Sequence, residues 1–592
     1  MNPRCLFALG AGAGLALAAA GAEPAYRIIN VSTLCLLNGS QYESREYVLG
    51  RLAECPAGAD LVVLPHLPFL SFRADQADTD LQPFLAFARE RRAYLALALT
   101  ELGGGEKPYH TAVLIGRDGQ VRGRYRKTHA FPDDAIALGN ELPVFETDFG
   151  KVGLTVTTDF YFPEVYQVLS MSGADLLVWH DYPERFRDHN GWDALLMARC
   201  LDSHAHLVAA MYADPRTYIT NRYECGMPGA AWGRSMILNR VGTPVADTGY
   251  EDGFATARID LDKRKLDVYQ PYREDESIFF VNNTGDRTAF RPVAAPYRKP
   301  ELPPYAKRTC RLAVGSFPGR DMWRKGAVPE VLLRLIDEAA ALKPDLLLFS
   351  EQSTNVDDET TRQVMNTVAE KAAKLQCYIA IGGIGDKDQS SILRVWDRTG
   401  KEIYGAPLYW VKGFPEIKVF DTDFGRVGAY ECGDLYIWEI QRTLALLGAE
   451  ILIDGSMMWG ASGSTNQTML RARAIDNAVW LACAHWPSSD ASLRSLIIDP
   501  YGQVMSSSPF QKESLIHFDI NLDDPRVHYA GRKTEQATPG KTDIPSYYTD
   551  NMPEQRPGWR DMVFGARRPE LYGIIPTVND VIRRYRPPKP ER

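Results

Sequence analysis

Apolar runs alternate with amphipathic segments along most of the chain. Residues 26–34 (YRIINVSTL) predict a first strand, and residues 48–69 predict a helix that leads into the buried strand DLVVLP. Residues 80–102 repeat this order, and residues 109–129 predict two strands joined at Asp118-Gly119. Uniformly apolar strands that alternate with helices are typical of sheets covered by helices, and the hairpin indicates mixed sheets. We therefore expect an α/β fold in which two sheets face each other with helices outside.

The same pattern occurs twice. A stretch of 35 residues from Val144 aligns without a gap on the stretch from Val419, an offset of 419 − 144 = 275. Three further blocks keep the same order, ADLVVLPH with PDLLLFSE, ARCLDSHAHLVAA with ARAIDNAVWLACA, and RSMILN with RSLIID. Repetition on this scale indicates a duplicated domain and not a solenoid of short repeats.

The repeat and the composition between its copies set the expected domain boundaries. A chain of 592 residues is too long for one hydrophobic core, so two domains are expected. We expect domain 1 at 26–285, a Pro-rich linker at 286–308, domain 2 at 309–540 and a C-terminal tail at 541–592.

Residues 1–22 have the features of a secretory signal peptide. Arg4 precedes a Gly- and Ala-rich apolar run, and small residues stand at 20–22, where a signal peptidase would cut. We therefore expect an exported protein, periplasmic or extracellular. No later stretch is long and apolar enough to span a bilayer, so no membrane attachment is expected.

Composition is that of a soluble globular protein, with 45% apolar and 24% charged residues and a formal net charge of −8. Because there is no basic block, we expect no nucleic-acid partner, and a small polar or neutral molecule remains the expected substrate. Homo-oligomer formation is left open. Composition excludes neither an enzyme nor a binding protein.

The nine cysteines are scattered, and one of them, Cys5, lies in the signal peptide. There is no CxxC pair and no Cys/His pair at ligand spacing, so we expect neither a metal nor a dense disulfide framework. Cofactors are likewise not expected. Cys377 and Cys483 lie inside apolar runs and are interpreted as inert core residues.

Cys432 lies in the segment 427–439 (VGAYECGDLYIWE), where an apolar strand is followed by a small residue, an acid and a predicted helix. A sharp strand-to-helix turn can expose a nucleophile beside free backbone N–H groups. The alternative is that Cys432 is simply a small buried side chain. The first copy of this turn has Thr157 at the same position.

An acid after an apolar strand, a lysine at the end of a YRK-type strand and a cysteine in a CxD turn together resemble the carbon–nitrogen hydrolases, or nitrilase superfamily. That resemblance implies an αββα sandwich, a Cys nucleophile, a Glu general base and a Lys that holds the oxyanion. In the second half these roles fall to Cys432, Glu351 and, less directly, Lys412. Counting from the hairpin glycine, the lysine position is Leu408, so Lys412 is the nearest replacement.

In the first half the resemblance places His66, Lys127 and Thr157 at the three catalytic positions. A threonine without a matched base is a poor nucleophile, so this site is interpreted as degenerate and domain 1 as inactive. Asp134 falls near a second acid of the family pattern. The resemblance also implies that the tandem domains pack as an intramolecular pseudo-dimer.

Two functions follow from these observations. The first is a hydrolase that cleaves a carbon–nitrogen bond, in an amide or carbamoyl amine of a small molecule, through the thiolate of Cys432. The alternative is a catalytically lapsed binding or scaffold protein, a pseudoenzyme with the same fold. Asp434 and Glu439 are interpreted as structural acids, and the segment RRPELYG from Arg567 as a packing or interface element.

Overall fold

The structure is a computed structural model. It describes residues 27–103, 105–131, 134–182, 191–213, 233–261, 287–317, 328–352, 354–355, 357–388, 391–409, 413–457, 463–486, 494–509, 512–523 and 559–577. The predicted signal peptide, Lys412 and most of the expected tail lie outside the described residues.

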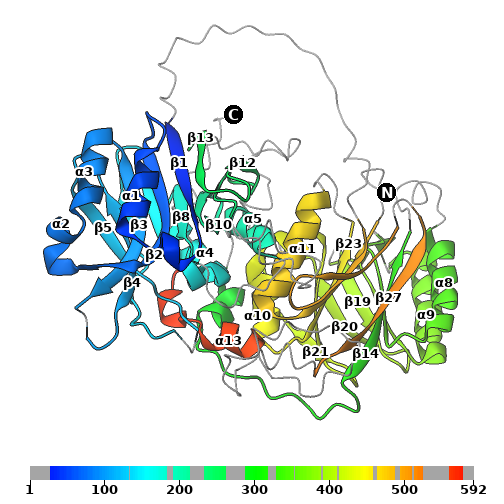
Figure 1. Ribbon diagram of the computed structural model, residues 1–592. Coiled ribbons are helices and arrows are strands. Elements are labelled where there is room, and N and C mark those ends of the chain that lie inside the picture. The colour runs from blue at the N-terminus through cyan, green and yellow to red at the C-terminus, as the bar shows by residue number, and fades with distance from the viewer. Residues whose placement is uncertain are drawn as a thin grey trace, which may run out of the picture.

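The first half contains two β-sheets that face each other (Figure 1). The strands of the first sheet are β1 (Ile28–Leu37), β2 (Leu61–Arg73), β3 (Tyr94–Leu102), β4 (Tyr109–Ile115), β5 (Val121–Arg126), β10 (Tyr212–Ala213) and β13 (Gly253–Asp260). Their order is β10-β1-β2-β3-β4-β5, and β13 also pairs with β1. Both parallel and antiparallel pairs occur, and the expected hairpin joins β4 to β5 through Gly119, whose φ is 77°.

The second sheet of this half completes the sandwich. Its strands are β6 (Val144–Glu146), β7 (Lys151–Val156), β8 (Leu176–His180), β9 (His206–Ala210), β11 (Met236–Leu238) and β12 (Pro244–Asp247), in the order β12-β11-β9-β8-β7-β6. Val31 and Leu61 of the first sheet share a buried cluster with Val152 and Val178 of the second. The apolar strands therefore pack face to face, as their sequence pattern predicts.

Helices cover both outer faces. The helices of this half are α1 (Arg45–Ala53), α2 (Ala77–Asp80), α3 (Gln82–Arg91), α4 (Pro163–Met171) and α5 (Trp192–Ser203). Leu52 of α1 and Phe84 of α3 pack with Val62 of β2 and Leu95 of β3 on the outer face of the first sheet. Leu169 of α4 packs in another cluster with Leu177 of the second sheet. The layers are thus α, β, β and α.

The second half repeats this architecture. Its helices are α8 (Val328–Ala339), α9 (Glu359–Leu375), α10 (Trp438–Leu446) and α11 (Gly463–Asn477). Its strands are β14 (Thr309–Ser316), β15 (Leu346–Phe349), β16 (Thr354–Asn355), β17 (Tyr378–Ile381), β18 (Ile384–Gly385), β19 (Ile392–Trp396), β20 (Glu402–Pro407), β21 (Val419–Asp421), β22 (Arg426–Tyr430), β23 (Ile451–Ser456), β24 (Trp480–His485), β25 (Leu496–Ile498), β26 (Val504–Ser507) and β27 (Ser514–Asn521).

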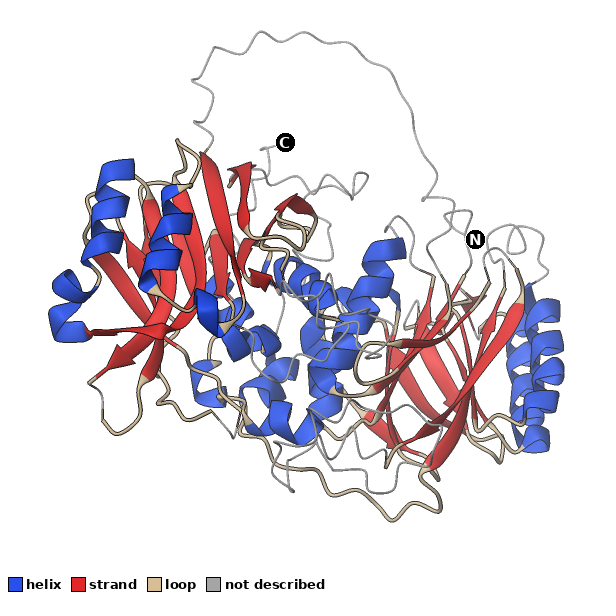
Figure 2. Cartoon of the chain, viewed as in Figure 1, coloured by secondary structure: helices blue, strands red, loops and turns tan. Residues whose placement is uncertain are grey.

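The two main sheets of this half have the orders β20-β19-β17-β15-β14-β27 and β21-β22-β23-β24-β25-β26, and β16 pairs with β18 separately. The predicted fold class, two tandem αββα domains, is confirmed. Figure 2 shows the two sandwiches with a helical layer between them. In the described part of the chain, no helix combines the length and apolarity that crossing a bilayer requires.

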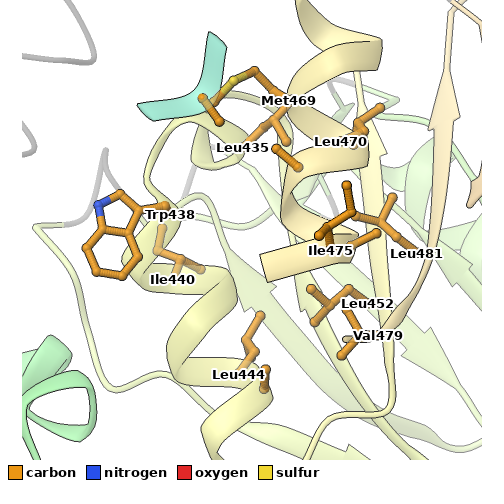
Figure 3. Packing of buried hydrophobic residues seen from close by; sticks show 14 of the residues in the cluster. Leu435, Trp438, Ile440, Leu444, Leu452, Met469, Leu470, Ile475, Val479 and Leu481 are labelled. Carbon is orange, nitrogen blue, oxygen red and sulfur yellow. The ribbon is translucent and has the colours of Figure 1, made fainter. Parts of the chain in front are cut away.

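The halves contact each other through α5 and α11 (Figure 1). Figure 3 shows part of the cluster on the α10 and α11 side, where Leu435, Trp438, Ile440 and Met469 are buried together. Such a cluster stabilises the packing of these helices by removing apolar surface from water.

Two reciprocal ion pairs cross the contact between the halves. Arg199 of α5 pairs with Asp476 of α11 at 2.6 Å, and Arg473 of α11 pairs with Asp202 of α5 at 2.7 Å. All four side chains are buried. ARCLD in one half aligns with ARAID in the other. Each arginine therefore pairs with the aspartate of the other half that matches the aspartate three residues after it in its own half.

The segments that follow each domain also cross to the other side. Arg287 pairs with Glu439 at the start of α10, and Arg567 pairs with Glu164 of α4 at 2.9 Å. Glu164 and Glu439 occupy matching positions of the repeat. Their partners show that these acids serve as ion-pair anchors for the crossing segments.

The predicted linker is not extended throughout. Residues 288–294 form a 3-10 helix, η5 (Thr288–Ala294), whose Phe290 and Val293 are fully buried. Residues 295–308 contain neither helix nor strand. Phe290 packs against Phe414 of domain 2, with ring centroids 5.0 Å apart. The start of the linker is therefore a packed element of the second half.

Residues 559–577, which follow the second half in the sequence, pack on the first half. Their described elements are α13 (Trp559–Gly565) and the 3-10 helix η9 (Pro569–Leu571). The Trp559 ring lies 5.2 Å from that of Tyr161, and Tyr572 stacks on His129 with ring centroids 5.7 Å apart. The packing role predicted for RRPELYG is consistent with these contacts.

Candidate active site

Cys432 lies at a strained turn between a strand and a helix. Strand β22 ends at Tyr430, and the 3-10 helix η7 (Cys432–Tyr436) connects it to α10. Cys432 itself has φ 52°, in the left-handed region that side chains other than Gly rarely adopt. A residue held this way costs about 1–3 kcal/mol and persists only where the surroundings fix it.

Several contacts fix this turn. The backbone N–H of Cys432 donates to Asp454 Oδ1 at 3.2 Å, and Asp434 Oδ2 accepts from the Tyr409 N–H at 3.0 Å. Gln441 Nε2 donates to the Asp434 carbonyl at 2.9 Å. The Asp434 carboxylate thus bonds backbone, as the sequence predicts for a structural acid.

The first half contains the same turn with a different side chain. Thr157 has φ 45° and begins the 3-10 helix η3 (Thr157–Tyr161), which leads into α4. Asp159 accepts from the backbone N–H groups of Val156 at 2.9 Å and His129 at 3.0 Å. Because the backbone is alike in both halves, the turn is architectural and does not by itself indicate catalysis.

Glu351 lies close enough to Cys432 to act on it electrostatically. It lies two residues after the end of β15 and is 8% exposed. Burial raises the pKa of the Cys432 thiol well above its usual range, and the Glu351 charge raises it further. The structure therefore brings together the predicted nucleophile and the predicted base, and it favours the thiol over the thiolate in the resting site.

The strand register locates the missing lysine. Arg126 pairs with Thr111 across β4 and β5, and the next residue, Lys127, donates its N–H to the His110 carbonyl at 2.8 Å. In the second half Pro407 pairs with Ile392 across β19 and β20, and the next residue, Leu408, donates to the Ser391 carbonyl at 3.3 Å. Leu408 therefore occupies the position of Lys127, in agreement with the count from the hairpin glycine.

Further acids surround Cys432. Asp454 Oδ2 accepts from the Cys483 thiol at 3.5 Å, and burial raises the pKa of Asp454 well above its usual range. Glu431, directly before Cys432, is fully buried, and its Oε2 accepts from Ser391 Oγ at 2.7 Å. Burial and then the Glu351 charge raise the pKa of Glu431 well above its usual range.

Sequence reasoning missed Glu431, Asp454 and Ser391. Asp454 is a polar residue inside the apolar run ILIDGS, which is a usable signal, because a charge buried in a central strand needs a specific partner. Glu431 directly precedes Cys432, but the direction of its side chain depends on how the two sheets are placed. Ser391 has no sequence signal of its own.

The degenerate positions of the first half also lie near one another. Lys127 is fully buried and pairs with Asp134 at 3.2 Å. The His66 and His110 rings lie 4.4 Å apart, and burial together with the Lys127 charge lowers the pKa of His110 to about 3. This half keeps the cation and lacks both a thiol and an acid at the positions of Cys432 and Glu351.

The described cysteines other than Cys432 are buried, and none of those that the structure describes forms a disulfide. Burial raises the pKa of Cys377 to about 12. For Cys483 burial and then the Asp454 charge raise the pKa. Both side chains fit the inert core role that their sequence context predicts.

Comparison with known proteins places the chain in a family. The family model "Carbon-nitrogen hydrolase" matches residues 36–266 and 318–527. Deaminated glutathione amidase of Synechocystis sp. (strain PCC 6803 / GT-S) is 31% identical over 235 residues, which cover 35% of this chain and 82% of that protein. Omega-amidase NIT2 of Homo sapiens is 28% identical over 190 residues, which cover 28% of this chain and 64% of that protein.

Among solved structures, Saccharomyces cerevisiae Nit3, a member of branch 10 of the nitrilase superfamily, aligns with a TM-score of 0.34 and 21% identity, over 42% of this chain and 96% of that chain. The family assignment depends on the sequence matches, which cover each half separately and most of the chain together. This chain belongs to the carbon–nitrogen hydrolase family.

Proposed function

We propose that the second half hydrolyses the carbon–nitrogen bond of a small-molecule amide or carbamoyl amine, with Cys432 as nucleophile and Glu351 as general base. The observation that carries this proposal is the pairing of a thiol at the strained turn with a nearby carboxylate, in the one half that has both residue types. The amidase names of the similar proteins support the same reaction class.

The proposed chemistry has two stages, acylation of the thiol and hydrolysis of the thioester, and each stage forms one bond and breaks one bond at the acyl carbon and moves one proton through Glu351. As Cys432 Sγ bonds to the carbonyl carbon, its proton passes to Glu351 and the carbonyl electron pair moves to oxygen. Collapse of this intermediate breaks the carbon–nitrogen bond, and Glu351 returns the proton to the leaving amine. Water then attacks the thioester, with Glu351 again as base, and releases the acid and the free thiol.

Because the pKa of Cys432 is raised, attack and proton transfer to Glu351 need to be coupled. A thiolate formed in advance would stand beside negative charge in a buried site, which is unfavourable. A base within hydrogen-bond reach removes the proton only as the sulfur–carbon bond forms.

We propose Lys412 as the group that stabilises the oxyanion, although it lies outside the described residues. Loss of one oxyanion donor typically costs about 100- to 1,000-fold in rate. Lys412→Met should therefore lower kcat by this factor and leave the turn at Cys432 intact.

The alternative function, a lapsed binding or scaffold protein, is favoured by one observation. Leu408 stands at the strand position where the first half has Lys127, so the second site lacks a lysine there. We also propose that the protein is exported and that its two halves take the place of a homodimer. Light scattering of the mature protein would test the latter, and a stable dimer of the full chain would contradict it.

The test of the main proposal is thiol reactivity together with amide hydrolysis. Iodoacetamide should label Cys432 faster than Cys377 or Cys483, and the mature protein should release ammonia or an amine from some member of a panel of small amides. Cys432→Ser should abolish hydrolysis, whereas Thr157→Ala, the matched change in the first half, should leave it unchanged. Equal labelling of the three thiols, or equal loss from both substitutions, would favour the binding protein.

A further inference from the structure

Arg473 connects three parts of the molecule. Its Nη1 and Nη2 donate to Asp202 Oδ2 and Oδ1 of the first half at 2.9 and 2.7 Å. Its Nε donates to the carbonyl of Leu435 at 2.9 Å. Leu435 belongs to η7, the short helix that begins with Cys432. One guanidinium therefore joins the first domain to the turn that holds the candidate nucleophile.

This connection is rigid for physical reasons. Arginine offers its N–H groups in a planar fork, so the two bonds to Asp202 fix the direction in which Nε points. Both side chains are almost fully buried, at 0% and 2% exposed for their side-chain atoms. A buried ion pair is held because an unpaired buried charge would be strongly unfavourable. Asp202 therefore orients the donor that the Leu435 carbonyl accepts.

The packing around the turn points the same way. Helix α11, which carries Arg473, contacts η7, and Met469 from this helix is buried in the same cluster as Leu435 (Figure 3). Cys432 has a positive φ, which the turn can keep only if its neighbours are held in place. The Leu435 carbonyl is three residues beyond Cys432, so a shift there changes the direction of the thiol.

The first half contains the equivalent arrangement, centred on Arg199, which offers a matched control. Arg199 Nη1 and Nη2 donate to Asp476 Oδ2 and Oδ1 at 3.1 and 2.6 Å. Its Nε donates to the carbonyl of Phe160 at 2.8 Å, inside η3. That turn presents Thr157, which has no proposed catalytic role. The two connections thus have the same chemistry and differ in the turn that each one supports.

We propose that Asp202 and Arg473 are positioning residues for Cys432, so that the first domain acts as a structural support of the active site in the second. This inference depends on the proposed function, and it assigns a role to the domain whose own catalytic positions are degenerate. Neither residue touches the reacting atoms. Their effect passes through the Leu435 carbonyl and the backbone of η7.

The test compares Asp202→Asn with Asp476→Asn in the mature full chain. Both substitutions weaken a buried ion pair at the same interface, so both should lower the free energy of unfolding by similar amounts. Only Asp202→Asn should slow iodoacetamide labelling of Cys432 and lower kcat, by roughly 10- to 100-fold, because small misplacements of a reacting group have effects of this size. Equal slowing by both variants, or by neither, would overturn the proposal.

A second measurement is independent of catalysis. Hydrogen exchange followed by mass spectrometry should show faster exchange at residues 432–436 in Asp202→Asn and at residues 157–161 in Asp476→Asn. Unchanged exchange at 432–436 in Asp202→Asn would overturn the positioning role even if the protein is an active hydrolase. If wild-type Cys432 proves unreactive, the proposed hydrolase fails while the exchange result still decides whether the first domain holds the turn.

Arg473→Lys keeps the positive charge and is the variant to use if Asp202→Asn does not fold. Lysine can still pair with Asp202, but it cannot bond Leu435 and Asp202 together with one planar group. Stability should change less than in Asp202→Asn, and exchange at 432–436 should still increase. Wild-type exchange and wild-type labelling in this variant would contradict the inference.

Discussion

Glu431→Gln tests the electrostatics of the site directly. Glu431 is fully buried, and the charges that act on its carboxyl, Glu351 and Asp434, are both negative. Its hydrogen bonds come from Ser391 Oγ and the Gly383 N–H. Because burial and these charges raise its pKa well above the usual range, we expect Glu431 to keep its proton to a higher pH in the folded protein than in the unfolded chain.

The size of the effect follows from proton linkage. Between the unfolded pKa of about 4.3 and the raised folded pKa, the folded state holds one more proton than the unfolded state. The stabilisation that comes from this proton is complete below about pH 4.3 and is lost as the pH rises through the folded pKa. The free energy of unfolding of the wild type should therefore fall, relative to that of Glu431→Gln, by about 1.4 kcal/mol per pH unit.

Urea unfolding of both proteins at intervals between about pH 5 and pH 7 measures this slope. Glutamine is neutral and similar in shape, so the variant should fold and should lack the slope. Glu359→Gln, at the exposed start of α9, is the matched control and should follow the wild type across this interval. A constant difference between wild type and Glu431→Gln over the interval would refute the reasoning, because Glu431 would then be ionised in both states.

Three further predictions follow from the packing and the site. Gly382→Ala should destabilise the protein by about 1–3 kcal/mol, since a Cβ there would lie 2.8 Å from the Gly455 carbonyl oxygen and 2.9 Å from Glu431 Oε1. The control Gly50→Ala, in open space on α1, should be neutral or stabilising, and the urea midpoints of the two variants would show the contrast. Trp559→Ala should lower stability by about 3–5 kcal/mol, because the buried ring contacts Phe131 and Tyr161 and its Nε1 donates to the Ile475 carbonyl at 3.1 Å; a change below about 1 kcal/mol would show that the end of the chain contributes little. Leu408→Lys should lower the pKa of Cys432 and speed its alkylation, because it restores a cation at the register of Lys127; unchanged alkylation across pH would show that this position does not face the thiol.

The fold could be predicted because the information was local and repeated. Apolar periodicity predicted the strands and helices. The gapless alignment of the stretch that begins at Val144 with the stretch that begins at Val419 showed that the same layers occur twice. Counting from the hairpin glycine also placed Leu408 at the lysine position, because a hairpin register is fixed by its turn. Pairing of Glu351 with Cys432 came from the resemblance, and the structure brings both to the same site.

The features that were missed depend on contacts between distant parts of the chain. Glu431 could be identified as important only after its carboxyl was seen to reach Ser391, which precedes β19, and Gly383, which follows β17, at the ends of strands of the opposite sheet. In the link from Asp202 through Arg473 to Leu435, the first two residues are 271 positions apart in the sequence. No periodicity encodes such a link, because a polar residue in a helix does not indicate which distant residue it contacts.

The crossing end segments affect the order in which the protein can fold during synthesis. The bond between His129 Nε2 and the Tyr572 hydroxyl joins residues 443 positions apart, and Trp559 packs on rings near the same loop of the first half. The first half emerges from the ribosome long before residues 559–577 are made, so this loop of the nascent domain stays uncovered until that segment is synthesised. The segment that completes the domain made first is thus made after the second domain, and a chain that stopped between residues 540 and 559 would contain both predicted domains and still lack this segment.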